Sequence, residues 1–207
     1  MHSGLLAAYY GQRRGGLPAG YARVSYIRAA GEQYIDSGQL IGRLLVVRAD
    51  IAFTRINSTQ VNGTFEEGGR ADFAGVSSGA YFVGCSNVSS PTNYPADTAR
   101  HSFSIDLEHG AWAIDAASGS VAPYDYPLCT RSLYIGARHE SRTMYPCWED
   151  VFGVEMDYGG EPSRRFVPCV RRRDNKPGLY DLCGSVCAQT GTAFYINIGP
   201  GADFAWG

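Results

Sequence analysis

The sequence predicts an all-β domain, a two-sheet antiparallel sandwich, preceded by a short N-terminal arm. Three observations predict this fold. Apolar residues recur at every second position in several short segments, turn-forming residues separate these segments, and no stretch has an apolar stripe at helical spacing over three turns. The 207 residues include 26 Gly, 10 Pro and 14 Tyr, a composition that favours strands and turns over helices. This length fits one large β domain.

Alternation is clearest in residues 43–53 and 102–108, where every second residue is apolar and Arg, Asp, Glu and Ser occupy positions between them. Such segments are typical of half-buried strands with one face in the core. The dipeptide His109-Gly110 then predicts a tight two-residue hairpin loop. The core positions predicted by alternation are Leu45, Val47, Ala49, Ile51, Phe53, Phe103, Ile105, Leu107, Trp112, Ile114, Leu133, Ile135, Ala137, Phe152, Val154 and Met156.

Residues 1–20 lack this alternation and end in a Gly- and Pro-containing stretch, so we interpret them as an arm and linker ahead of a sandwich over residues 21–207. The arm has an apolar patch that would be out of place in a purely solvated tail. It is either a disordered terminus or an anchor that docks on a larger assembly. The anchoring candidates are Leu5, Leu6, Tyr9 and Tyr10.

The charge pattern excludes some partners. A net charge of −2 argues against a nucleic-acid-binding protein, and no segment has the ~20 apolar residues of a transmembrane helix. Arg13 and Arg14 follow the apolar run of the arm, the reverse of a secretory signal, so we expect no signal peptide. We therefore expect the six cysteines to be mostly small buried hydrophobic residues.

Two stretches resemble a known family. Residues 17–38, LPAGYARVSYIRAAGEQYIDSG, and 165–191, RFVPCVRRRDNKPGLYDLCGSVCAQTG, are similar to the opening and closing motifs of concanavalin A-like/laminin-G-like jelly-roll domains. These domains occur in tail, fibre and head-decoration proteins of phages and prophages. The chain departs from the pattern between Arg165 and Phe166, which lack an intervening Asp, and at residues 185–188, which replace an aromatic-containing strand.

The resemblance implies a jelly-roll fold and a place on a virion surface, after synthesis in the bacterial cytoplasm. It implies contacts with other virion proteins through residues 1–20, and a homo-oligomer within the assembly. The motif residues themselves have structural explanations. We expect the Tyr180 ring to lie in the core, and Pro168 to lie at an edge or at the end of a strand.

The sandwich class also includes laminarinase-like glycoside hydrolases, which carry paired acids on one strand face. Glu155 and Asp157 have that alternate spacing, whereas Glu161 is one residue too far along the chain. A glycan hydrolase that uses these two acids is therefore one alternative, and an ordinary solvated strand end is the simpler one. We expect no cofactor. A calcium site is conceivable at Asp97, Asp106 and Asp115, whose spacing is not that of a calcium motif.

Binding is the better hypothesis, because sugar sites combine aromatic faces with planar hydrogen-bonding groups. We expect Trp148 to be an exposed aromatic residue and residues 86–97 to form a recognition loop. Tyr134 and Arg138 should face away from the core side of their strands. Ordinary sheet surface is the simpler explanation for all of them. The candidate ligand-binding residues are Tyr81, Asn93, Tyr94, Tyr134, Arg138 and Trp148.

The sequence therefore favours a non-enzymatic virion component of a phage or prophage. Its sandwich would bind a carbohydrate or a host surface, and its arm would attach it to the particle. The alternatives are the glycan hydrolase and a purely structural protein that cements a capsid or tail.

Overall fold

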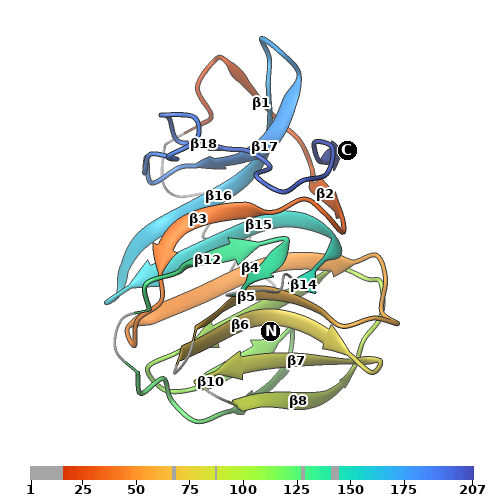
Figure 1. The fold of residues 1–207 in the computed structure, drawn as a ribbon, viewed down its shortest axis with the longest axis vertical. Helices are drawn as coiled ribbons and strands as arrows, with labels where there is room; N and C mark the ends of the chain where they lie inside the picture. Colours follow the sequence, from red (N-terminus) through yellow and green to blue (C-terminus); the bar gives the residue numbers. More distant parts are fainter. Residues whose placement is uncertain (1–15, 67–68, 87, 127–128, 141–144) are drawn as a thin grey trace.

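Two β-sheets packed face to face make up the structure, so the predicted all-β sandwich is confirmed (Figure 1). The computed structural model describes residues 16–66, 69–86, 88–126, 129–140 and 145–207, and of residues 88–91 only the main chain. The pairing is antiparallel except between β13 and β5, which run parallel. Within the described residues, no helix is long and apolar enough to cross a membrane.

The large sheet has eleven strands, and β15 and β4 pair along most of their length near its middle. In Figure 1 its β1, β17 and β18 lie at the top, past the small sheet. The strands in order are β11 (Ala117–Ser120), β10 (Ala111–Ile114), β9 (His101–Asp106), β4 (Leu45–Phe53), β15 (Trp148–Tyr158), β16 (Glu161–Arg171), β17 (Lys176–Asp181) and β18 (Phe194–Tyr195), with β1 (Tyr21–Arg23) beside β16, β2 (Ile27–Ala30) beside β15, and β19 (Ala205–Trp206) beside β2.

The small sheet has eight strands. Its order is β14 (Tyr145–Pro146), β13 (Ala137–His139), β5 (Gln60–Glu66), β6 (Gly69–Ser77), β7 (Ala80–Cys85) and β8 (Val88–Pro95), and β12 (Ser132–Ile135) pairs with both β3 (Ile35–Leu40) and β5. Two of its edge strands contain prolines, Pro91 and Pro95 in β8 and Pro146 in β14, whereas the edge strand β3 contains none. Proline has no N–H to offer a further strand, so it suits a sheet edge.

The core lies between the sheets, where the predicted alternation is confirmed for β4 and β9. Trp112 is also buried, as predicted. Five of the six cysteines are buried and all six are unpaired, which confirms that most serve as small hydrophobic residues. Burying this apolar surface is the main stabilising contribution to the fold.

Three local predictions were wrong. Phe152 does not join Val154 in the core, because a β-bulge between Val151 and Gly153 turns it towards the outer face. The β9–β10 connection has four residues, 107–110, rather than two. The predicted recognition loop at 86–97 is mostly strand β8, which pairs with β7 along the edge of the small sheet.

Polar side chains on the inner face of β5 bond to the main chain of the segment that carries β12, β13 and β14, at residues 132–140 and 145–148. Gln60 accepts a hydrogen bond from the Trp148 N–H (2.6 Å), and the Thr64 hydroxyl donates to the His139 carbonyl (3.0 Å). Asn62 accepts from the Gly136 N–H at 2.6 Å. All three β5 residues are fully buried, so these bonds replace water contacts that burial removes.

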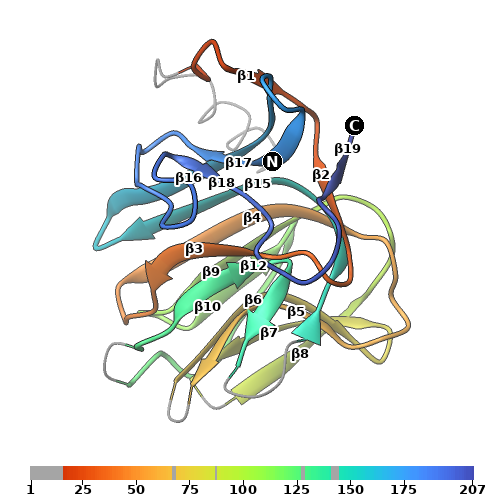
Figure 2. The same cartoon turned by 45° about the horizontal axis from the view of Figure 1, so that its top comes forward.

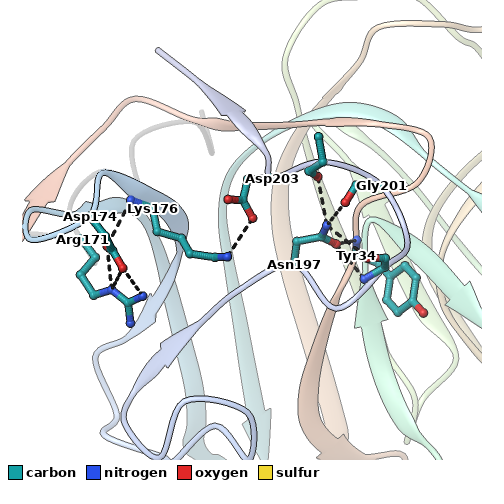
Figure 3. Close-up of polar contacts among 9 residues, drawn as sticks. Tyr34, Arg171, Asp174, Lys176, Asn197, Gly201 and Asp203 are labelled. Carbon is teal, nitrogen blue, oxygen red and sulfur yellow. Dashed lines mark hydrogen bonds and ion pairs between the residues drawn. The ribbon is translucent and has the colours of Figure 1, made fainter.

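The side-chain amide of Asn197 helps to hold the C-terminal segment, residues 197–207, in place (Figures 2 and 3). Figure 2 shows β19 beside β2. The Asn197 carboxamide accepts from the Tyr34 N–H (3.1 Å) and donates to the Gly201 carbonyl (3.1 Å), and Lys176 pairs with Asp203 (3.1 Å), as drawn in Figure 3. The tail is therefore held by these side chains together with main-chain hydrogen bonds to residues 25, 26 and 34.

The closing motif is structural, although one detail differs from prediction. Tyr180 is half-buried, with its ring 4.9 Å from Tyr21, and Leu179 takes the core position instead. Asp181 is fully buried and accepts hydrogen bonds from the N–H groups of Arg165 and Cys183. The predicted anchoring residues Leu5, Leu6, Tyr9 and Tyr10 lie outside the described residues.

Replacing His101 by Gln should remove a pH dependence of stability. Burial lowers the pKa of His101, but hydrogen bonds to Asp97 and Asp115 and their charges outweigh burial and raise it. This contribution to the free energy of unfolding is therefore full below about pH 6.5 and is lost as the pH rises through the folded-state pKa. Urea unfolding should give a difference between wild type and His101→Gln that shrinks from about pH 6 to 9. A constant difference would contradict this assignment.

Candidate functional site

The predicted ligand-binding residues do not form one site. Tyr81 is fully buried, with its ring against Phe53 and Phe103, so the prediction of a surface role for this ring is corrected. Tyr94 is half-buried and packs 5.7 Å from Tyr81. Asn93 is exposed on β8 with a left-handed main chain (φ 55°), away from any convergent set of polar groups.

Neighbouring groups cover the rings of Tyr134 and Trp148. The Tyr134 ring stacks on Tyr34 (5.0 Å) and on His139 (4.1 Å), so both of its faces are covered, contrary to a role in stacking on a sugar. The Trp148 ring lies against Gly31 and beneath the Arg55 guanidinium at 4.7 Å. Trp148 is half-buried rather than an exposed aromatic residue.

Arg138 borders a hollow of about 370 Å³ on the outer face of the small sheet, which we call the small-sheet hollow. The strand register establishes the face: Ala71 and Cys85 are paired and point into the core, so their neighbours Arg70 and Gly84 point outwards. The residues that line the hollow are Thr59, Val61, Arg70, Ser77, Ser78, Ala80, Tyr81, Phe82, Arg138 and Tyr145.

Glycines within the strands allow large side chains to lie flat in the floor of this hollow. A Cβ on Gly75 would come within 2.4 Å of the Phe82 ring, and a Cβ on Gly84 within 2.7 Å of Arg70 Nε. Each side chain therefore covers a glycine on the neighbouring strand. Glycine inside a strand is destabilising in general, and its use here leaves room for Phe82 and Arg70 to lie against the main chain.

The two arginines of the hollow are held by a buried carboxylate. Arg70 Nε bonds to Asp72 Oδ2, and Arg138 Nη1 lies 3.4 Å from the same oxygen. Burial raises the pKa of Asp72, and the two guanidinium groups oppose that rise. Arg138 also pairs with Glu140 (2.8 Å) and stacks 4.2 Å from the Tyr145 ring. The guanidinium groups are thus fixed in place before any ligand arrives.

Among the residues that line the hollow, sequence reasoning named Arg138 and Tyr81 but missed Arg70, Phe82 and Tyr145, and it also missed the buried Asp72 that holds the arginines. One signal was present in the sequence. Gly75 and Gly84 interrupt segments that are otherwise typical of strands, and such glycines mark places where another group approaches the main chain closely. The pairing that brings them together depends on a register that no local pattern reveals.

The paired acids proposed for hydrolysis are held by arginines. Glu155 is buried, lies directly opposite both Arg48 and Arg165, and pairs with Arg165 at 3.0 Å. Asp157 pairs with Arg48 at 2.5 Å. This alternation of charge across β4, β15 and β16 accounts for both carboxylates without a catalytic role.

The aspartates considered for calcium also have other partners. Asp97 and Asp115 flank His101 at 2.9 and 2.6 Å, and Asp106 bonds to His109 at 2.9 Å. In the part of the chain that the structure describes, no group of three or more His, Cys, Asp or Glu residues is arranged to hold a metal ion.

Comparison with known proteins adds no relative to these observations. No family model matches the chain, and no curated protein matches it either. The assignment of a function therefore depends on the geometry of the small-sheet hollow.

Replacing Arg138 by Ala should destabilise the fold. The change removes one of the two guanidinium groups beside the buried Asp72 and leaves Arg70 as its partner, which should cost about 1.5–3 kcal/mol, the contribution of a hydrogen bond to a charged group. Arg100→Ala is the matched control. Arg100 pairs with Asp50 but its side chain is 52% exposed, so its loss should cost about 1 kcal/mol or less. Urea denaturation measures both, and equal effects would contradict the role assigned to Asp72.

Proposed function

We propose that this chain is a non-catalytic glycan-binding protein and that a sugar residue occupies the small-sheet hollow. The floor of the hollow carries the proposal, because it places the exposed part of Phe82 (7%) beside two guanidinium groups whose side chains are 14% and 10% exposed. A sugar presents an apolar C–H face to a ring and hydroxyl groups to planar donors. The hollow offers both an aromatic ring and planar hydrogen-bond donors.

The size and rim of the hollow support the same proposal. Its volume of about 370 Å³ lies within the range of small-molecule sites, roughly 300–1,000 Å³. The rim carries hydroxyl groups from Thr59, Ser77 and Ser78, which can donate to or accept from a sugar. Both arginines already face carboxylates, so the hollow does not require a charged ligand to balance them.

The resemblance at residues 17–38 and 165–191 supports a place for this protein on the surface of a phage or prophage particle. In that setting the sandwich would recognise a host-surface or mucosal glycan, and residues 1–20 would attach it to other virion proteins. Mass spectrometry of purified particles tests this part of the proposal. Recovery of the chain only with cell envelopes, and never with particles, would contradict it.

The hydrolase alternative has less support, because Glu155 and Asp157 are both engaged with arginines. A panel of polysaccharides with wild type, Glu155→Ala and Asp157→Ala tests it. Hydrolysis by the wild type that is lost in both variants would replace our proposal with that alternative.

Gly84→Ala should weaken glycan binding by about tenfold, because the new Cβ displaces Arg70 from the floor of the hollow. The new Cβ would also come within 2.9 Å of the buried Asp72 Oδ2 and would disturb the Arg70–Asp72 pair, so the fold should lose about 1–3 kcal/mol of stability. Gly20→Ala is the matched control, because nothing lies within 4 Å of its added Cβ.

A glycan array with the folded wild type and both glycine variants makes the measurement. Binding that is reduced in Gly84→Ala and unchanged in Gly20→Ala supports the site. Absence of any glycan signal from the wild type, together with particles that become unstable without residues 1–20, would favour the purely structural cement function.

A further inference from the structure

A glutamate lies at the centre of the sandwich, where the surrounding side chains are mostly apolar. Glu149 is fully buried, and its strand neighbours are Phe53 on β4 and Ala29 on β2. Its Oε2 accepts one hydrogen bond, from Asn62 Nδ2 at 2.6 Å, and Oε1 has no partner among the described residues. A carboxyl group in such a place is far more stable protonated than ionised.

Asn62 connects this carboxyl group to the main chain of the segment that carries β12, β13 and β14. Its Oδ1 accepts from the Gly136 N–H at 2.6 Å, and the Gly136 carbonyl accepts from the Cys147 N–H at 2.9 Å. Gly136 has a left-handed main chain (φ 91°), and a Cβ there would be 2.6 Å from the Gln33 carbonyl. The junction of Glu149, Asn62, Gly136 and Cys147 is therefore closely packed.

This junction backs one wall of the small-sheet hollow. Arg138 is two residues beyond Gly136, Tyr145 is two residues before Cys147, and Val61 precedes Asn62. All three line the hollow. A movement of the junction would therefore move this wall of the hollow directly, without a long path through the protein.

We propose that the protonation state of Glu149 controls the shape of the small-sheet hollow through Asn62 and Gly136. This regulation rests on the proposed function, since the hollow is the glycan site. The ionised carboxyl group needs a second strong hydrogen-bond donor for Oε1, and the neighbouring Cys147 thiol is only a weak one. Water must then enter beside β5, and its entry loosens residues 136–140 and 145–147 and the wall that they carry.

The charged surroundings of Glu149 favour the protonated form. Burial is the main cause that raises the pKa of Glu149, to about 8. The hydrogen bond from Asn62 lowers this pKa, the charge of neighbouring Asp150 raises it, and the hydrogen bond with the Cys147 thiol lowers it by the least. Asp72 lies near enough to act on Cys147. Among the described residues, no Arg, Lys or His contributes to the titration of Glu149.

Amide NMR spectra between about pH 6 and 9.5 test the coupling without any glycan. We expect the Gly136 and Arg138 amide shifts of the wild type to change with a midpoint near the Glu149 pKa of about 8. Their hydrogen-exchange protection, corrected for the intrinsic rate, should fall by about tenfold or more above that midpoint. Glu149→Gln stays neutral and should abolish both changes, whereas the exposed Glu161→Gln should keep them.

Amides of Gly136 and Arg138 that stay constant in the wild type, or that titrate identically in Glu149→Gln, would overturn the proposal. These results are independent of the glycan array. A transition that depends on Glu149 in a protein that binds no glycan would reject the proposed function and retain the switch. Glycan binding without the transition would do the reverse.

Discussion

The buried amide of Asn62 is the interaction on which much of the small sheet depends. It bonds to the main chain of Gly136 with its oxygen and to the Glu149 carboxyl group with its nitrogen. Without it, the Gly136 N–H would be left unsatisfied or open to water, which is costly in a buried place. Arg138 and Tyr145 lie on the same segment as Gly136, so the hydrogen bonds of Asn62 help to fix the position of this wall of the hollow.

The strand that carries Asn62 also shows which parts of the fold could not be predicted from the sequence. β4 and β9 could be predicted because one face of each strand is apolar and the other is partly polar, so the period of two is visible. On β5 the inward residues are polar and the outward residues include Val61, which inverts the usual pattern. β8 was hidden by its prolines and serines, and Phe152 by a bulge that shifts the face of a side chain.

The candidate site was less predictable than the fold, because its residues are brought together only by the pairing register of strands that are distant in the sequence. Arg138 could be assigned to the outer face from its own strand, but its partner Asp72 is 66 residues earlier in the chain. Tyr81 and Tyr134 were predicted to bind a ligand from their residue type and position in the sequence, yet neighbouring side chains cover both rings. Ring exposure is a property of packing, and a single sequence contains no direct record of it.

The proline-interrupted margins of the small sheet have a consequence for how the protein can associate. A free strand edge is a template that another chain can extend, and prolines at Pro95 and Pro146 remove donors from that template. The β8 and β14 edges therefore offer fewer N–H groups to which another strand could be added. Pairing of these edges between separate molecules, which is the geometry of fibril growth, is thereby disfavoured.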